Sequence, residues 1–154
     1  MTVRTSRVEA AGSVRIRMGG FQSRFRNSIP VRFGEVDQQG VVFNAHYLAY
    51  CDDTLERWVR TFGDVRALGW DMMLVKATIE WQGSAGHLDT IDVDVAVTRY
   101  GRTSFTLGYR GTVAGAPLFT SEIVYVNVSP GSDEPCEMPA VIRQGLGRAV
   151  DPPT

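Results

Sequence analysis

A short polar segment, Glu35 to Gly40, contains the residues best suited to chemistry. Asp37 stands three positions before Gly40, and two aliphatic residues and an aromatic one follow at once. A helix is predicted to begin just after them, at Asn44. Helix N-termini present unpaired N–H groups and the positive end of the helix dipole, which stabilise a nearby anion or developing oxyanion. A carboxylate beside such donors suits the hydrolysis of an acyl group.

The predicted helix runs from Asn44, a good N-cap residue, to Phe62, and Gly63 is placed to end it. Apolar residues recur along it at spacings of three and four, as on the buried face of an amphipathic helix. The opposite side carries charged residues, and we expect Asp52 and Asp53 to form part of a solvated face. Glu35 lies two residues before Asp37, so the two carboxylates would share a face only if a strand continued through both.

The other elements have the period of strands. Ile29, Val31 and Phe33 alternate with more polar residues and predict a first strand. Four further strands are predicted over 72–81, 90–98, 103–113 and 118–128, with a short helix near 140–146. In the strand from Thr90, one face carries the apolar residues Ile91, Val93, Val95 and Val97. The other face carries Asp92, Asp94 and Thr98, so we expect one buried face and one solvated face. This order indicates an α+β domain with an antiparallel sheet on one long helix.

Length and composition limit the class of protein. The chain has 154 residues, 44% of them hydrophobic, and a formal net charge of −1, which fits one globular domain and excludes a disordered chain. We place that domain at residues 27–147. Residues 1–26 form a basic extension without assigned function, and residues 148–154 form a tail. The balanced charge argues against nucleic acid as a partner, although the basic extension leaves that alternative open.

No apolar run is long enough for a membrane span, and the N-terminus lacks the apolar block of a secretory signal. Cys51 and Cys136 are too few for a disulfide framework. These features predict a cytoplasmic protein. His87 and Asp89 make a poor metal pair without a third ligand, so no metal site is expected.

The segment from Phe33 to Tyr50, FGEVDQQGVVFNAHYLAY, resembles the hotdog-fold acyl-CoA thioesterases of the 4-hydroxybenzoyl-CoA thioesterase type. That family has an Asp, two variable residues, a Gly, two aliphatics and an aromatic, followed by a helix that opens with a polar residue and an aromatic. The residues that match in order and spacing are Asp37, Gly40, Val41, Val42, Phe43, His46 and Tyr47. The segments GHLDTIDVDVAV and RYGRTSF, with Arg102 and Ser104, extend the resemblance over residues 28–145.

The resemblance implies a curled antiparallel sheet of about five strands wrapped around one long helix, and an enzyme that hydrolyses an acyl or aromatic acyl thioester to the free acid and coenzyme A. Asp37 is the implied general base or nucleophile, and His46 a second catalytic residue that orients water or substrate. Substrate contacts are expected from the residues Gly40, Val41, Val42, Phe43, Tyr47, Arg102 and Ser104. Arg102 suits the coenzyme A phosphates because a guanidinium offers several planar donors.

No cofactor is expected beyond the coenzyme A of the substrate. The exposed edge of a curled sheet predicts dimerisation, and the resemblance implies sites at subunit interfaces and a homotetramer. Each residue also has a structural explanation: Asp37 as a turn residue, Asn44 as a cap, Arg102 as surface charge. Two alternatives stay open, a hotdog-fold dehydratase or hydratase and a non-catalytic acyl-thioester binder.

Overall fold

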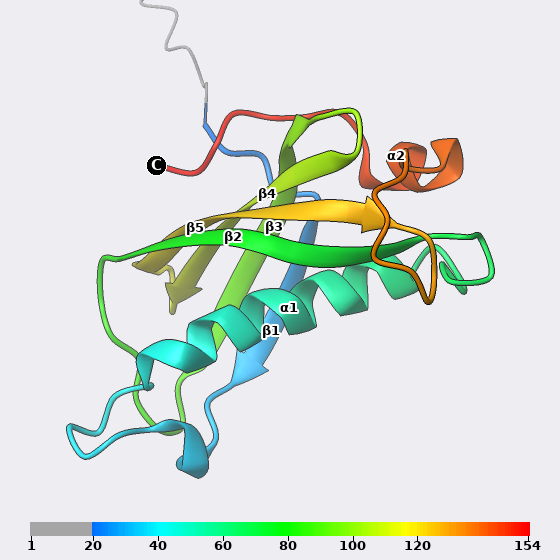
Figure 1. Ribbon diagram of the computed structural model, residues 1–154. Coiled ribbons are helices and arrows are strands. Elements are labelled where there is room, and N and C mark those ends of the chain that lie inside the picture. The colour runs from blue at the N-terminus through cyan, green and yellow to red at the C-terminus, as the bar shows by residue number, and fades with distance from the viewer. Residues whose placement is uncertain (1–19) are drawn as a thin grey trace, which may run out of the picture.

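The computed structural model describes residues 20–154, so residues 1–19 of the predicted basic extension lie outside the described part. Figure 1 shows one long helix crossing a strongly curled sheet. In chain order the elements are β1 (Phe25–Pro30), the 3₁₀ helix η1 (Phe33–Glu35), α1 (Asn44–Arg60), β2 (Asp71–Trp81), β3 (Thr90–Tyr100), β4 (Ser104–Val113), β5 (Ala116–Val128) and α2 (Ala140–Leu146).

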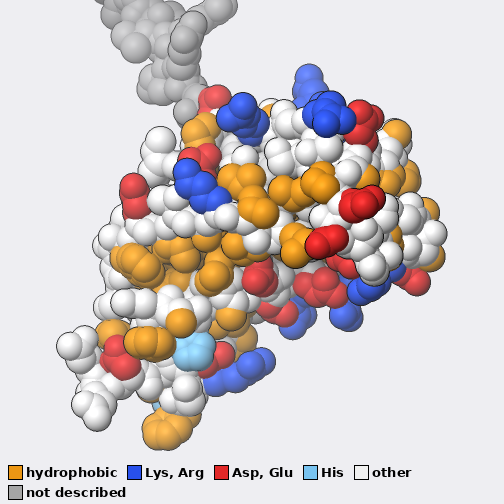
Figure 2. Space-filling view, in the orientation of Figure 1, with side chains coloured by type: hydrophobic (Ala, Val, Ile, Leu, Met, Phe, Trp, Pro, Cys, Tyr) orange, Lys and Arg blue, Asp and Glu red, His pale blue; other side chains and the backbone are white. Residues whose placement is uncertain are grey.

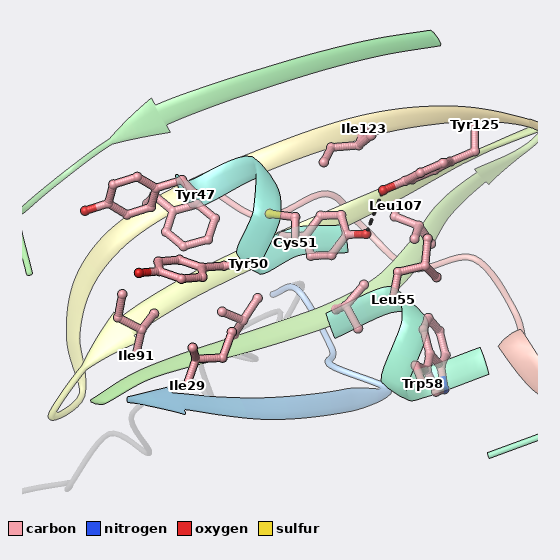
Figure 3. Close-up of a cluster of buried hydrophobic side chains, with 14 of the residues drawn as sticks. Ile29, Tyr47, Tyr50, Cys51, Leu55, Trp58, Ile91, Leu107, Ile123 and Tyr125 are labelled. Atoms are coloured by element: carbon pink, nitrogen blue, oxygen red, sulfur yellow. Dashed lines mark hydrogen bonds between the residues drawn. The ribbon is translucent and has the colours of Figure 1, made fainter. Parts of the chain in front are cut away.

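The five strands form one sheet in the order β1-β3-β4-β5-β2, and every neighbouring pair is antiparallel. The helix α1 lies on the concave face and buries Tyr47, Tyr50, Cys51, Thr54, Leu55, Trp58 and Val59. Figure 3 shows the helical side chains of this face, from Tyr47 to Trp58, beside Ile29, Ile91, Leu107 and Ile123 from the sheet. The predicted α+β hotdog arrangement is thereby confirmed, with α2 as a second, short helix.

The first strand is shifted toward the N-terminus relative to the prediction. β1 begins at Phe25 and ends at Pro30, while Phe33 opens η1 and is 77% exposed. The alternation of Ile29, Val31 and Phe33 therefore overran the strand. Pro30 removes a backbone donor, and the chain turns directly after it.

The helix start also differs from the prediction. Asn44 is the first helical residue of α1, Phe43 is the N-cap, and no side chain caps this end. The Phe43 backbone instead accepts the N–H of His46 and donates its own N–H to Glu35. The N-terminus of α1 is therefore fastened to the preceding loop through the main chain.

The outer face of β3 is less wet than the alternation of Asp92, Asp94 and Thr98 predicted. Asp94 is 2% exposed, because the Arg26 guanidinium binds both of its carboxylate oxygens at 2.9 Å and Arg110 lies at 3.4 Å. Both ends of the described chain also form main-chain hydrogen bonds with β3: Arg24 donates to Val95, and Val150 donates to Val97. Residues assigned to the extension and to the tail thus contribute to the folded domain.

The Asp94 ion pair gives a prediction about stability. Burial opposes ionisation, but hydrogen bonds from Arg26 and Arg110 outweigh it and hold the pKa of Asp94 below its ordinary value. The stabilisation is therefore complete above an ordinary Asp pKa of about 4 and is lost as the pH falls through the lowered native pKa. We expect Asp94→Asn to lower the free energy of unfolding by about 1–3 kcal/mol at pH 7. The loss is smaller than for a fully buried ion pair, because solvent screens the exposed Arg26 guanidinium.

Urea denaturation at pH 7 and at stepwise lower pH measures this effect. The control is Glu56→Gln, which removes an exposed ion pair with Arg60 and should cost less than about 1 kcal/mol. Equal costs for the two variants, or a cost for Asp94→Asn that grows on acidification, would contradict the assignment.

Candidate active site

Asp37 lies in a small hairpin-like loop between η1 and α1. Its N–H donates to the Val41 carbonyl at 2.9 Å, and its carbonyl accepts the Gly40 N–H at 3.0 Å. Gly40 has a φ of +77°, a left-handed conformation that favours glycine and closes the turn. The Gly of the motif is therefore a requirement of the loop that holds the aspartate.

The Asp37 carboxylate is half-buried, and only one of its two oxygens accepts a hydrogen bond from the residues that the structure describes. Its Oδ1 atom accepts the Gln39 N–H at 2.8 Å, and Oδ2 accepts no hydrogen bond from the residues that the structure describes. Oδ1 thus performs the turn role expected of an aspartate, which leaves Oδ2 free for chemistry. The structural and catalytic readings of Asp37 are compatible.

Unpaired donors stand close to this loop at the start of α1. The Phe43 N–H donates to the Glu35 carbonyl, and the His46 N–H donates to the Phe43 carbonyl. The N–H groups of Asn44 and Ala45 have no backbone acceptor within residues 20–154. Such free amides at a helix N-terminus can bind an oxyanion. The predicted combination of carboxylate and helix start is therefore present in one region.

A second loop supports the first from the side. Val42 donates to the Ala85 carbonyl, and Val41 forms an isolated bridge with Gly86. A Cβ at Gly86 would stand 3.3 Å from the Gly40 carbonyl oxygen, so only a glycine allows this approach without displacement. The β2–β3 connection therefore fixes the position of the Asp37 loop.

The other predicted residues of the motif lie around the same end of α1. Val42 and Tyr47 are buried, and the Tyr47 ring packs against Phe119 and Trp81. Phe43 is 52% exposed and meets the partly buried His46 edge to face. Val42 and Tyr47 thus serve mainly as the wall behind the site, while Phe43 and His46 are open to a ligand.

Arg102 and Ser104 lie elsewhere. They line an open pocket of about 240 Å³ at the β3–β4 turn, together with Arg143 of α2. The Asp37 loop is near the opposite end of β3, since Asp89, just before that strand, accepts the Val31 N–H. Ten residue steps of β3 at about 3.3 Å each separate the two ends by roughly 30 Å. One chain therefore does not bring these residues to Asp37.

Asp52 is a functional candidate that the sequence reasoning missed. It accepts a hydrogen bond from the Tyr125 hydroxyl at 3.1 Å, and that hydroxyl lies 3.2 Å from the Tyr109 hydroxyl, the contact drawn as a dashed line beside Cys51 in Figure 3. Burial raises the pKa of Asp52 despite the hydrogen bond from Tyr125. Its position at i+4 from Leu48, on the border of the apolar stripe, was the available signal.

The edge strand β2 leaves apolar side chains uncovered beside α1. Exposed hydrophobic residues of this strand are Met73, Leu74, Val75 and Trp81. Figure 2 shows hydrophobic side chains gathered over the region that β2 and α1 occupy in Figure 1. Tyr125 binds Asp52 and pairs with Leu74 in the sheet register, so Asp52 lies on the side of α1 that is turned toward β5 and β2.

Within residues 20–154, no group of three His, Cys, Asp or Glu side chains could hold a metal ion, and no helix is long and apolar enough to cross a membrane. Glu35 and Asp37 do not act as a pair: the Glu35 carboxylate binds Tyr50 and the Arg32 N–H, whereas Asp37 binds Gln39.

Comparison with known proteins supports the same class. A sequence model described as the thioesterase-like superfamily matches residues 31–146. A 1,4-dihydroxy-2-naphthoyl-CoA hydrolase from Synechococcus elongatus is 24% identical over 127 residues, 79% of this chain and 93% of the relative.

Two solved structures share the fold. A 1,4-dihydroxy-2-naphthoyl-CoA thioesterase from Synechocystis has a TM-score of 0.70 at 19% identity, over 79% of this chain and 94% of its own. A thioesterase from Thermus thermophilus, complexed with coenzyme A and Zn, has a TM-score of 0.69 at 22% identity, over 80% and 92%.

All three of these proteins are named as thioester hydrolases, the enzyme class expected from the sequence. They support a hotdog thioesterase without singling out the 4-hydroxybenzoyl-CoA type. With the family match over residues 31–146 and the sheet curled around α1, the chain belongs to the thioesterase-like superfamily.

Proposed function

We propose that this protein hydrolyses an acyl-CoA thioester to a free acid and coenzyme A, with Asp37 as the catalytic carboxylate. The observation that carries the proposal is the free Oδ2 of Asp37 in a loop fastened to the start of α1, where two amides lack a backbone acceptor. A general base and an oxyanion site are the two groups that acyl transfer to water requires.

In the general-base route, Asp37 takes a proton from water as its oxygen attacks the thioester carbon. The C–S bond then breaks, and the thiolate of coenzyme A recovers the proton. In the nucleophilic route, the Asp37 carboxylate attacks the thioester carbon, and the C–S bond breaks to give a mixed anhydride and the thiolate of coenzyme A; water then hydrolyses the anhydride to the free acid and restores Asp37, and the thiolate takes the proton that is released. In both, the free amides at Asn44 and Ala45 stabilise the carbonyl oxygen, and His46 orients water or substrate. Neither route uses a metal or an organic cofactor.

A second copy of the chain completes the proposed site. β2 is a long edge strand with an apolar, exposed border, which favours pairing with another strand. At one end of β2, the Trp81 ring contacts Tyr47 at the start of α1. At the other end, Met72 next to Asp71 pairs with Asn127, and the Asn127 N–H donates to the Thr103 carbonyl in the turn that carries Arg102. Antiparallel pairing of two β2 strands therefore sets the partner's Arg102 and Ser104 beside this chain's Asp37.

In that dimer, the partner's Arg102 binds the phosphates of coenzyme A, as its donor geometry suits. Association of two dimers into a tetramer remains part of the proposal. The two cysteines are free, and they suit the reducing cytoplasm that we propose as the location.

For the acyl group, we propose a hydroxylated aromatic ring. Asp52 stands eight residues beyond Asn44, which is about 12 Å along α1, and its carboxylate is turned toward Tyr125 of β5, the strand next to β2. The exposed apolar side chains of β2 and the carboxylate of Asp52 fit a flat ring with a hydrogen-bond donor at its far end. The relatives named as dihydroxynaphthoyl-CoA hydrolases point to the same class.

A matched pair of substrates tests the role of Asp52. We expect 4-hydroxybenzoyl-CoA to have a kcat/KM about 10- to 100-fold above that of benzoyl-CoA, because a hydrogen bond to a charged group contributes about 1.5–3 kcal/mol. Asp52→Asn, which keeps an acceptor for Tyr125, should reduce this preference and leave benzoyl-CoA nearly unaffected. An equal loss with both substrates would assign Asp52 to structure only.

The function itself is tested with short, medium, long and aromatic acyl-CoAs, by following the loss of thioester absorbance. Turnover of at least one member supports the proposal. Binding of acyl-CoA without turnover favours the non-catalytic binder, and release or uptake of water across the acyl chain with the thioester intact favours the dehydratase or hydratase.

A further inference from the structure

We propose that Glu35 is a positioning residue, which holds the Asp37 loop in register with α1 through a hydrogen bond from Tyr50. The inference rests on the proposed catalytic role of Asp37. Glu35 reaches the helix by two independent connections, one through its main chain and one through its side chain.

The main-chain connection joins the two ends of the loop. The Glu35 carbonyl accepts the Phe43 N–H at 2.9 Å, Val36 forms a bridge with Val42, and Asp37 donates to Val41. These contacts make a short ladder with Asp37 at its closed end. The β2–β3 connection supports this ladder from the side, and Phe43 joins it to the start of α1, but neither contact reaches the body of the helix and sets the angle between the two.

The side-chain connection supplies that constraint. The Glu35 carboxylate is 14% exposed, and its Oε2 accepts both the Arg32 N–H at 2.9 Å and the Tyr50 hydroxyl at 2.7 Å. Tyr50 lies nearly two turns into α1 and is 4% exposed, with its ring against Tyr47. The carboxylate thus links the residue before the loop to a rigid part of the helix.

Both groups are held in the protonation states that this bond requires. Burial opposes ionisation of Glu35, but the Arg32 N–H and the Tyr50 hydroxyl outweigh it and lower its pKa. Burial, followed by the hydrogen bond to Glu35, raises the pKa of Tyr50. An ionised acceptor and a neutral donor make a strong, short hydrogen bond at neutral pH.

The consequence for catalysis is geometric. A misplacement of the reacting groups by about 1 Å can cost on the order of 100-fold in rate. If the Glu35–Tyr50 bond sets the angle of the ladder, its loss displaces Asp37 relative to the α1 amides. Substrate binding along β2 and at the partner's Arg102 does not depend on that angle, so kcat should change more than KM.

The experiment is a double-mutant cycle with Glu35→Gln, Tyr50→Phe and the double variant, on the acyl-CoA that the wild type hydrolyses best. We expect each single variant to lose about 10- to 100-fold in kcat, with KM within about threefold of the wild type. The double variant should lose no more than the worse single one, because both remove the same bond.

The control is Glu56→Gln, which removes one carboxylate from the exposed side of α1 and should keep the wild-type kcat. Circular dichroism at the assay temperature establishes that each variant is folded. Multiplicative losses in the double variant, or losses carried by KM alone, would overturn the positioning role.

The two hypotheses fail in different ways. If Asp37→Asn keeps full activity, the proposed function of Asp37 is wrong, whatever Glu35 does. If Asp37→Asn is inactive while folded Glu35→Gln and Tyr50→Phe keep the wild-type kcat, Asp37 remains catalytic and the inference about Glu35 is overturned.

Discussion

Replacing Asp37 by Asn is expected to lower kcat by about 10²- to 10⁴-fold, the usual contribution of a positioned general base. The amide keeps an oxygen for the Gln39 N–H, so the turn that holds residue 37 persists. What the variant loses is the negative Oδ2, the atom that accepts no hydrogen bond from the described residues. We therefore expect the loss to lie in the chemical step, with KM little changed, as measured by thioester absorbance at saturating substrate.

Asp64→Asn is a closely matched control. The Asp64 Oδ1 atom accepts the Arg66 N–H two residues later, as Asp37 accepts that of Gln39, but it lies beyond the other end of α1. This variant should keep full activity. Similar thermal unfolding temperatures for both variants would show that the turns survive. A fully active Asp37→Asn enzyme would reduce Asp37 to a turn residue and remove the basis of the proposed mechanism.

The site around Asp37 was predictable because its signals are local. A Gly with positive φ, an aspartate that binds its own turn and a helix starting a few residues later all lie within Glu35 to His46. Backbone geometry of this kind depends on neighbours in sequence. The predicted start of the helix was off by one residue, because the N-cap is Phe43 and Asn44, assigned as the cap, is the first helical residue.

Features that depend on distant partners were not predictable in the same way. Asp94 looked like part of a wet face, and only the pairing of β1 with β3 sets Arg26 against it. Asp52 is exposed, as the predicted solvated face requires, but only the approach of β5 to α1 gives it Tyr125. The periodicity of a sequence predicts which residues share a face of a helix or strand. Which other element packs on that face depends on the tertiary fold.

The role of Arg102 was not predictable for a related reason, because it depends on contacts between two chains. Within one chain it lies about 30 Å from the Asp37 end of the sheet, by the length of β3. A role in the Asp37 site therefore requires a second chain. This requirement gives the proposal of a shared site a direct test that does not depend on knowing the tetramer.

Two damaged chains should restore each other's activity if the site is shared. Asp37→Asn lacks the catalytic carboxylate, and Arg102→Ala lacks the phosphate contact, so each homodimer should lose most of its kcat/KM. A mixed dimer contains one site with both residues intact and one site with neither. Random pairing of equal amounts makes half of the dimers mixed, so about a quarter of the wild-type kcat/KM should return after co-refolding.

The control mixture combines Asp37→Asn with Asp37→Ala, which cannot complement each other in any arrangement of subunits. Arg99→Ala, a neighbouring exposed arginine, should keep activity by itself and exclude a general effect of charge. A mixture of the two damaged chains that gives only the mean of its parents would place Arg102 outside the partner's site. Pairing through β2 would then have no role in catalysis. Its only consequence would be to cover the exposed side chains of Leu74, Val75 and Trp81.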